Sequence, residues 1–319
     1  MTEILKGKPV VDSLNLHLKN RCDELRALGA APTLAIIRVG ENGDDIAYER
    51  GAAKCCEAAG VGVRKYHFET EVTQEEVVGL VRSINDDGSV HGVLILRPLP
   101  PHIDDRAVCR ALAPEKDIDG ITEYSMAGLY SDKRVGFAPC TAEACIDMLD
   151  HYGVGIEGKR AVVVGRSFVV GKPVAMMLLR RNATVSICHT KTKGLAQICR
   201  EADILVVAAG RAKLIGGDHM GEGQVIVDVG INFDEEGNLC GDVDGAAADG
   251  RAAAITPVPG GIGRVTTAVL AKHVVEACQM SLTGKRCHRS VKIKNCGRGG
   301  AEEFLRRSQP PFFIRFIDK

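Results

Sequence analysis

The sequence predicts an α/β protein whose second half is a Rossmann-like doubly wound parallel sheet. Short apolar runs of strand length alternate with longer helical patterns along most of the chain. The Val-rich run 161–164 ends at a glycine, and a helical pattern and a second apolar run, 183–188, follow it. This strand–turn–helix–strand order places a helix N-terminus where it can face a phosphate group.

The turn after residue 164 holds the first candidate binding residues. Gly165 and Gly171 are six positions apart, whereas the usual dinucleotide fingerprint is G-x-G-x-x-G. The glycines alone therefore fit a tight turn without a ligand as well as they fit a phosphate site. Arg166 and Ser167 lie between them, and a cation and a hydroxyl can both bind phosphate. Pro173 suits the first turn of the following helix.

The end of the second apolar run bears on the choice of cofactor. An NAD site usually has an acidic residue there for the ribose 2′-hydroxyl. Here the chain continues with His189, Thr190 and Lys191, and none of these is acidic. Thr190, Lys191 and the nearby Arg166 suit a 2′-phosphate, so NADP is favoured over NAD. Lys191 fits equally well as an ordinary solvated loop lysine.

Composition excludes several classes of protein. The chain has 319 residues, 45% of them hydrophobic and 26% charged, as in soluble globular proteins. It lacks a signal-peptide core and an apolar run of membrane-spanning length, so a cytoplasmic protein without a membrane partner is expected. The charge balance is −7 over residues 1–280, and there is no Trp, so no nucleic-acid partner is expected. The 12 Cys residues are scattered without C-x-x-C pairs, which favours free thiols in a reducing compartment over disulfides or a metal site.

The remaining elements follow in order along the chain. In the first part, strands are expected at 34–39, 61–68 and 92–96 and helices at 10–25, 46–59, 73–85 and 104–112. Thr73 and Glu76 predict a capping box at the third helix. Further on, strands are expected at 202–208, 224–229 and 253–255 and helices at 140–152 and 263–280.

Two segments have an unusual composition. The loop 256–263 is dense in Pro and Gly and can fix backbone groups close to a ligand, or it can serve as a plain interdomain linker. Residues 283–319 are basic and contain four of the eight Phe residues. A poorly ordered extension is the preferred interpretation of this tail over a nucleic-acid arm.

Six motifs over residues 1–280 together resemble the methylenetetrahydrofolate dehydrogenase/methenyltetrahydrofolate cyclohydrolase family, and they occur in the family's order. They are Val39-Gly40 with Tyr48, Lys116-Asp-Ile-Asp-Gly120, Pro139-Cys-Thr141, Val164-Gly-Arg-Ser with Val170-Gly-Lys-Pro173, Asp228-Val-Gly-Ile-Asn232 and Thr256-Pro-Val-Pro-Gly-Gly261.

The resemblance implies two α/β domains with a cleft between them. The catalytic, folate-binding domain would comprise residues 1–121 plus 263–282, and the NAD(P)-binding domain residues 122–262. The family is commonly homodimeric. NADP would contact the positions of Gly165, Arg166, Ser167, Gly171, Thr190 and Ile231.

The resemblance also implies the reaction. A hydride passes from the one-carbon bridge of methylenetetrahydrofolate to nicotinamide, and the protein mainly has to position the two rings. Asp119 matches the family's folate-binding aspartate and Tyr48 a tyrosine of the same pocket. Pro257, Gly260 and Gly261 match the loop beside the folate. Asp119 could alternatively cap a helix or loop.

The sequence departs from the family motif at the residues that serve the second activity, the cyclohydrolase reaction. The cyclohydrolase motif has a lysine four residues after the tyrosine, where this chain has Ala52. Lys54 cannot replace it, because position 54 is turned by roughly 200° from position 52 on a helix. Asp45 stands at a serine position and Leu96 at a glutamine position. Alanine and leucine have no titratable group, so the sequence predicts that oxidation is retained and that cyclohydrolase activity is lost or very weak. A separate cyclohydrolase would then act in the same pathway.

Three alternatives remain open at this point. The chain could be fully bifunctional and use Asp45 or Glu49 as a base. It could bind folate or nucleotide without catalysis. It could also be an unrelated hydroxy-acid dehydrogenase, which would need a base such as His189 beside the nicotinamide.

Overall fold

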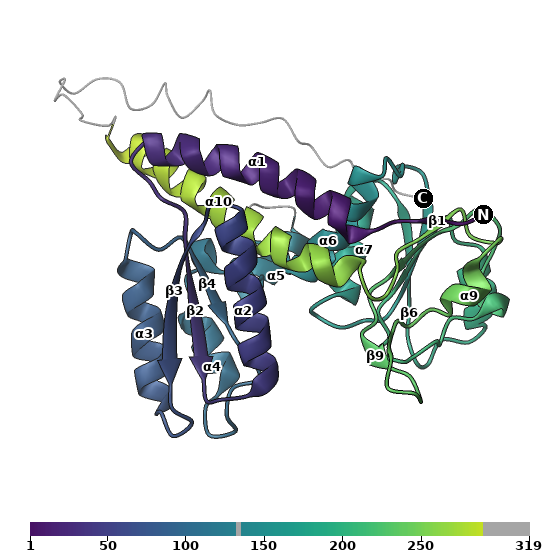
Figure 1. The fold of residues 1–319 in the computed structure, drawn as a ribbon, viewed down its shortest axis with the longest axis horizontal. Coiled ribbons are helices and arrows are strands. Elements are labelled where there is room, and N and C mark those ends of the chain that lie inside the picture. Colours follow the sequence, from purple (N-terminus) through teal and green to yellow (C-terminus); the bar gives the residue numbers. More distant parts are fainter. Residues whose placement is uncertain (132–134, 290–319) are drawn as a thin grey trace, which may run out of the picture. The chain divides into compact units, whose positions relative to one another are not determined.

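Two parallel sheets organise residues 1–282, which form one compact unit (Figure 1). The structure is a computed structural model, and it describes residues 1–131 and 135–289. The smaller sheet has the strand order β3-β2-β4 and the larger sheet the order β1-β11-β8-β7-β5-β6, and all neighbours within both sheets are parallel. The predicted fold class, with a Rossmann-like second sheet, is confirmed.

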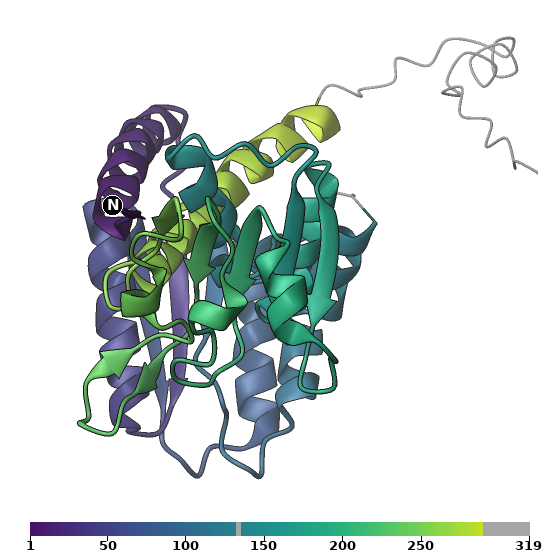
Figure 2. The ribbon, with the colours of Figure 1, turned by 90° about the vertical axis from the view of Figure 1, so that its right-hand side faces the viewer.

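The strands of the larger sheet lie side by side in Figure 2. The strands are β1 (Glu3–Ile4), β2 (Thr33–Val39), β3 (Gly62–Phe68), β4 (Gly92–Ile95), β5 (Arg160–Val164), β6 (Thr184–Cys188), β7 (Ile204–Val207), β8 (Val225–Asp228), β9 (Asn232–Phe233), β10 (Leu239–Cys240) and β11 (Ala254–Ile255). The helices are α1 (Gly7–Ala27), α2 (Gly43–Ala58), α3 (Gln74–Asp86), α4 (Asp105–Ala111), η1 (Pro114–Lys116), α5 (Glu123–Tyr130), α6 (Cys140–His151), α7 (Gly171–Arg180), α8 (Leu195–Arg200), η2 (Gly217–His219), α9 (Gly245–Ala248) and α10 (Ile262–Arg289).

Side-chain alternation along the strands explains how both faces of each sheet are covered. In β2, Ile37 packs with Val77 of α3, whereas its neighbour Ile36 packs with Ala52 of α2 on the opposite face. A strand that is buried on both faces reads as a continuous apolar run, which is why the strands were visible in the sequence. The predicted capping box at the start of α3 is confirmed.

One face of each sheet contributes to the same apolar cluster. Val163 of β5 and Ile36 of β2 both belong to it, together with Val269 and Val274 of α10. A Cβ added at Gly92 of β4 would lie 3.1 Å from Cγ2 of Val274, so α10 packs directly on the smaller sheet. The chain thus leaves the smaller sheet, builds the larger one and returns through α10.

One expectation needs correction. Residues 3–4 were grouped with the first domain, but they form β1 and pair in parallel with β11 of the larger sheet. A strand of two residues has no periodicity to reveal it. Residue 283, where the tail was expected to begin, is also where the compact unit 1–282 ends, and helix α10 continues beyond it to Arg289. Residues 290–319, where the poorly ordered extension was predicted, lie outside the described residues.

The structure shows no disulfide among the ten cysteines whose side chains it describes, and eight of these cysteines are buried. Within the described residues no helix combines the length and the apolar character that crossing a membrane requires.

Replacing Gly92 by Ala tests the contact between the smaller sheet and the loop behind it. The added Cβ would lie 2.8 Å from Cγ1 and Cγ2 of Ile118, so we expect Gly92→Ala to lower the free energy of unfolding by roughly 1–3 kcal/mol. Urea denaturation measures it. Gly79 of α3 is the matched control, because nothing lies within 4 Å of a Cβ there. Gly79→Ala should stabilise by up to about 1 kcal/mol, and equal effects of the two substitutions would contradict the prediction.

Candidate active site

The loop that follows η1, residues 117–120, contains Asp117 and Asp119 and is called the acidic loop below. It is anchored at both ends. At its start, Lys116 Nζ donates hydrogen bonds to the backbone carbonyls of Ile84 and Asp87, at the C-terminal end of α3. At its end, Gly120 has φ 66°, and a Cβ there would lie 2.6 Å from the backbone nitrogen of Pro139. Both a left-handed conformation and a close approach therefore require glycine at this position.

A fully buried carboxylate closes the same loop. Asp117 accepts hydrogen bonds from the backbone N–H groups of Ile121 (2.9 Å) and Thr122 (2.9 Å), and 0% of its surface is exposed. Ile118 is also 0% exposed, whereas Asp119 is partly exposed. Asp117 thus fixes the backbone of this loop, which is the kind of role that was considered as the alternative for Asp119.

Burial changes the ionisation of Asp119 and of Tyr48, and the charge of Asp119 also affects Tyr48. Burial raises the pKa of Asp119 to about 6, although a hydrogen bond from the Cys140 thiol favours the carboxylate. Burial, followed by the negative charge of Asp119, raises the pKa of Tyr48 above its usual value. At neutral pH the pair therefore presents a carboxylate acceptor and a protonated phenol, and 38% of the Tyr48 surface is exposed.

Two of the three positions that depart from the family motif, Ala52 and Leu96, are apolar and buried. Ala52 lies one helical turn after Tyr48 on α2 and is 0% exposed, and Leu96 is 5% exposed. Both belong to the cluster shared by the two sheets. Lys54 is exposed, as its position on the helix predicted. Neither buried position carries a group that can transfer a proton.

Glu49, one of the two alternative bases, is already fully engaged. Its Oε2 lies 3.0 Å from Arg38 Nε and 3.0 Å from His67 Nε2, and its Oε1 lies 3.0 Å from Lys65 Nζ. Burial by itself would raise the pKa of Glu49, but the hydrogen bonds from Lys65, Arg38 and His67 outweigh it and the pKa is lowered. A carboxylate with these three partners is a poor proton acceptor.

Asp45, the other alternative base, is in a different environment. It lies in the first turn of α2 and is half-buried. Burial, followed by the charge of Asp44, raises the pKa of Asp45, while Arg38 opposes the rise. A raised pKa makes this carboxylate a better proton acceptor than an ordinary aspartate.

The turn after β5 needs both of its glycines for backbone packing. A Cβ at Gly165 would lie 2.2 Å from the carbonyl oxygen of Ala208, which follows β7, and Gly165 has φ 133°. A Cβ at Gly171 would lie 2.3 Å from the carbonyl oxygen of Gly165. Because β6 lies on one side of β5 and β7 on the other, this turn sits where the strand order reverses, the usual ligand position in such sheets.

Ser167 has a more local role than the sequence suggested. Its Oγ accepts hydrogen bonds from the backbone N–H groups of Val170 (3.1 Å) and Gly171 (3.3 Å), so it shapes the entry into α7. The hydroxyl hydrogen still leaves Ser167 one donor for a phosphate oxygen. Arg166, beside it, is exposed.

The other predicted cofactor residues lie at the same edge of the larger sheet. Thr190 follows β6 and Ile231 follows β8, and both are exposed. His189 Nδ1 accepts a hydrogen bond from the Lys191 backbone N–H (3.1 Å), in a tight turn that directly follows β6. A histidine held in the β6 turn is on the side of the sheet away from β8, which does not support the hydroxy-acid dehydrogenase alternative.

Two buried aspartates that the sequence did not single out as site residues organise this edge. Asp228, 3% exposed, accepts hydrogen bonds from the backbone N–H groups of Gly230 (2.9 Å), Asp242 (3.0 Å) and Val243 (3.0 Å). Burial raises its pKa to about 6 against these hydrogen bonds. Asp228 begins the family motif Asp228-Val-Gly-Ile-Asn232, so the sequence contained a signal for this residue.

Asp242 clamps the neighbouring loop. It is 0% exposed and accepts hydrogen bonds from the backbone N–H groups of Ala209 (2.6 Å), Gly210 (3.0 Å) and Arg211 (2.7 Å). No local pattern marks this residue, because its partners are about thirty positions away in sequence. The loops after β7 and β8 are therefore held at the edge by buried acceptors.

The Pro- and Gly-rich loop packs closely on the start of α1. Gly7 N–H donates to the carbonyl of Gly260 (2.8 Å), and a Cβ at Gly261 would lie 2.5 Å from the carbonyl oxygen of Pro257. The loop follows β11 and leads directly into α10. It is therefore a tightly packed corner of the fold, which the linker alternative does not describe.

The residues at this edge fit a dinucleotide. Gly165 and Gly171 leave no side chain between the β5 turn and its neighbours, and α7 begins with its N-terminus there. Among the described residues there is no group of three or more His, Cys, Asp or Glu side chains that could hold a metal ion.

Comparison with known families agrees with this geometry. Residues 5–119 match the tetrahydrofolate dehydrogenase/cyclohydrolase catalytic domain, and residues 139–282 match the NAD(P)-binding domain of the same family. The chain belongs to this family. The second match includes residues 263–282, which were grouped with the first domain above.

Relatives and solved structures cover nearly the same residues. The chain is 46% identical over 278 residues to the bifunctional protein FolD of Clostridioides difficile, covering 87% of this chain and 97% of the relative. The crystal structure of FolD from Campylobacter jejuni, a methylenetetrahydrofolate dehydrogenase/cyclohydrolase, superposes with a TM-score of 0.85 at 38% identity, covering 88% and 99%. The structure of the Trypanosoma brucei enzyme, solved in complex with NADP cofactor and inhibitor, superposes with a TM-score of 0.81 at 34% identity. The match covers 88% of this chain and 98% of that chain.

Substituting Asp119 tests its raised pKa. The folded-state pKa of about 6 lies above that of an unfolded aspartate, so the ionised carboxylate lowers the free energy of unfolding. This loss of stability grows as the pH rises from about 4 to 6 and is complete above that range. We expect Asp119→Asn to remove the penalty and stabilise the protein by roughly 1–3 kcal/mol at pH 7.5. Urea denaturation at pH 5 and pH 7.5 measures this. If the free energies of unfolding of Asp119→Asn and wild type differ by the same amount at both pH values, the prediction is contradicted.

Proposed function

We propose that this protein oxidises 5,10-methylenetetrahydrofolate to 5,10-methenyltetrahydrofolate with NADP as the hydride acceptor. Family membership supports the reaction class, and the carboxyl edge of the larger sheet supports a dinucleotide site. In this proposal Asp119 and Tyr48 contact the folate, together with the backbone of Pro257, Gly260 and Gly261.

The charges of these side chains suit the chemistry. Bound NADP would take up the hydride from the one-carbon bridge, which leaves a methenyl cation stabilised by the two folate nitrogens. Above pH 6 the Asp119 carboxylate accepts hydrogen bonds from the donor-rich pterin edge and attracts this cation. The Tyr48 phenol stays protonated, so it can donate a hydrogen bond but does not act as a base.

We further propose that methenyl hydrolysis is lost or very weak. The observation that carries this proposal is Ala52, which is fully buried among apolar side chains one turn after Tyr48. Leu96 is buried in the same cluster. Glu49 does not offer a substitute base, because Arg38, Lys65 and His67 hold it as a carboxylate. A separate cyclohydrolase would then complete the pathway.

A second candidate function is the full bifunctional enzyme, with Asp45 as the base. The raised pKa of Asp45 favours it, since a half-buried carboxylate on α2 can accept a proton more readily than a solvated one. The same carboxylate could instead hold the cationic methenyl group electrostatically.

One mixing experiment separates these possibilities. Purified protein is combined with methylenetetrahydrofolate and NADP, and the absorbance of NADPH and of methenyltetrahydrofolate is followed. We expect NADPH to form while the methenyl signal decays at the rate of a protein-free control, because Ala52 and Leu96 carry no group that can act as a general base.

Accelerated decay of the methenyl signal would overturn the loss of hydrolysis. In that case Asp45→Asn identifies the base, since it should return the decay to the control rate. NADP binding without any NADPH formation would instead favour the remaining alternative, a non-catalytic folate- and nucleotide-binding protein.

Arg166 tests the preference for NADP. If its guanidinium binds the 2′-phosphate, Arg166→Ala should weaken NADP at least about tenfold more than NAD, because a charge-assisted hydrogen bond is lost. Calorimetric titration with both nucleotides measures this. Lys172→Ala is the matched control, because Lys172 Nζ already lies 3.8 Å from the centroid of the Phe168 ring. An equal loss for NADP and NAD in Arg166→Ala would contradict the assignment.

We propose a cytoplasmic homodimer as the working form. The free thiols support a reducing compartment, and the resemblance to the family supports the dimer. In domain terms we propose a folate-binding part, 5–121 plus 263–282, and an NAD(P)-binding part, 122–262, to which β1 adds a strand.

A further inference from the structure

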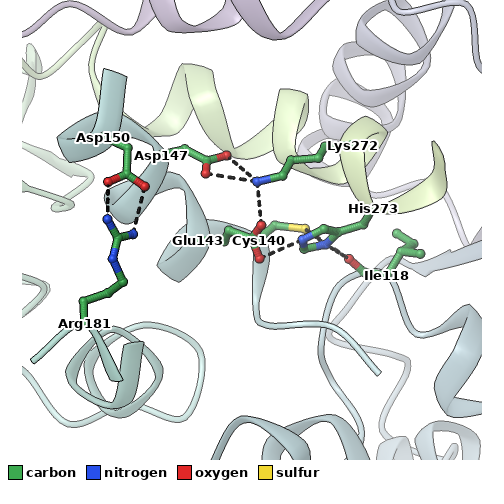
Figure 3. A network of polar contacts seen from close by, with 8 residues as sticks. All are labelled: Ile118, Cys140, Glu143, Asp147, Asp150, Arg181, Lys272 and His273. Carbon is green, nitrogen blue, oxygen red and sulfur yellow. Dashed lines mark hydrogen bonds and ion pairs between the residues drawn. The ribbon is translucent and has the colours of Figure 1, made fainter. Parts of the chain in front are cut away.

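A buried histidine on α10 lies directly behind the acidic loop (Figure 3). His273 is 1% exposed. Its Nδ1 lies 2.7 Å from the carbonyl oxygen of Ile118, and its Nε2 lies 2.9 Å from Oε2 of Glu143 on α6. A carbonyl oxygen and a carboxylate are both acceptors, so both ring nitrogens must carry hydrogen to make these contacts. The ring is therefore a charged imidazolium.

A network of opposite charges keeps this ring protonated. Lys272 Nζ lies 2.7 Å from Glu143 Oε1 and 2.9 Å from Asp147 Oδ2, so α6 and α10 are joined by four charged groups. Burial by itself would lower the pKa of His273, but the charge of Glu143 and its hydrogen bond raise it. Glu276, on the next turn of α10, also acts on the ring.

The network reaches Asp119 along two short paths. The Ile118 carbonyl, which accepts from His273, belongs to the residue immediately before Asp119. The Cys140 thiol lies 3.2 Å from the same carbonyl oxygen and hydrogen-bonds to the Asp119 carboxylate. The positive charge of His273 also favours the ionised form of Asp119. Both the backbone before Asp119 and its charge state are thus linked to the imidazolium.

The packing of α6 against α10 does not by itself require charged side chains. Apolar side chains of similar volume usually stabilise a buried helix contact at least as well as an ion network does. The adjoining contact of α6 with α7, where Asp150 and Arg181 pair at 2.7 and 2.9 Å, is half-exposed and does not touch the acidic loop. The network around His273 differs from this pair, because it ends on the Ile118 carbonyl.

We propose that His273 is a positioning residue, which fixes the Ile118 carbonyl and thereby orients the Asp119 carboxylate toward the folate. The proposal deepens the proposed function and rests on it for the identity of the ligand. Glu143 and Lys272 serve to hold the ring in place and charged.

Two substitutions of His273 separate its two hydrogen bonds. An Asn side chain places an amide N–H close to the position of Nδ1–H, whereas Gln places one close to Nε2–H. His273→Asn therefore keeps the bond to Ile118, and His273→Gln keeps the bond to Glu143. We expect His273→Gln to raise the KM for methylenetetrahydrofolate about tenfold with little change in the KM for NADP, and His273→Asn to restore most of the loss.

The control is Arg181→Gln, which breaks the neighbouring ion pair of α6 and should leave both KM values unchanged. Equal effects of His273→Asn and His273→Gln, or a parallel rise in the KM for NADP, would overturn the proposal. Circular dichroism checks that each variant is folded. If His273→Gln does not fold, Glu143→Gln replaces it, since a neutral ring should shift the acid limb of kcat/KM for the folate to higher pH.

A second readout separates this proposal from the proposed function. NMR titration of the ¹³C-labelled Asp119 carboxyl group in the ligand-free protein needs no turnover. Wild-type protein that fails to form NADPH would overturn the proposed function alone. An Asp119 titration midpoint that is the same in wild type and Glu143→Gln would overturn the link between the imidazolium and Asp119, whatever the reaction.

Discussion

The packing of α10 into the apolar cluster shared by both sheets is the contact on which the rest of the structure depends. The helix starts where the larger sheet ends, directly after Gly261, and reaches the smaller sheet at Val274. Three of the residues proposed to contact folate adjoin this helix, and α2, which carries Tyr48, is also joined to it. Gly260 and Gly261 precede it, Asp119 follows the carbonyl that His273 holds, and the Thr267 hydroxyl hydrogen-bonds to Cys55, on the next turn of α2 from Ala52.

The carboxyl edge of the larger sheet and the loop that carries Asp119 are built on the same principle. In both, buried carboxylates accept backbone N–H groups and fix the path of a loop, so that exposed neighbours are presented at defined positions. Asp117 does this beside Asp119, and Asp228 and Asp242 do it beside Ile231. Burial of these acceptors costs free energy that their hydrogen bonds offset. A rigid frame of this kind suits hydride transfer, which depends mainly on the alignment of two rings.

In the proposed function, the difference between the two family activities depends on a few side chains within an otherwise intact fold. Hydride transfer mainly needs the two rings to be positioned. Hydrolysis needs a proton acceptor, and where the family motif has its lysine this chain has Ala52, which is buried with Leu96 in the same apolar cluster. Glu49 is close in sequence but is held as a carboxylate by its contacts with Arg38, Lys65 and His67. The proposed loss of hydrolysis therefore requires no change of fold.

Local patterns in the sequence determined most of the strands and helices, the capping box of α3, the glycines of the β5 turn and the family. These features depend on residues within one element or one turn, where spacing and side-chain type are enough. The tertiary structure decided the pairing of β1 with β11, the clamp made by Asp242 and the position of His273 behind Asp119. Each of these joins residues from about 30 to about 250 positions apart. Such contacts leave no periodic trace, because they depend on which surfaces meet when the apolar cluster closes.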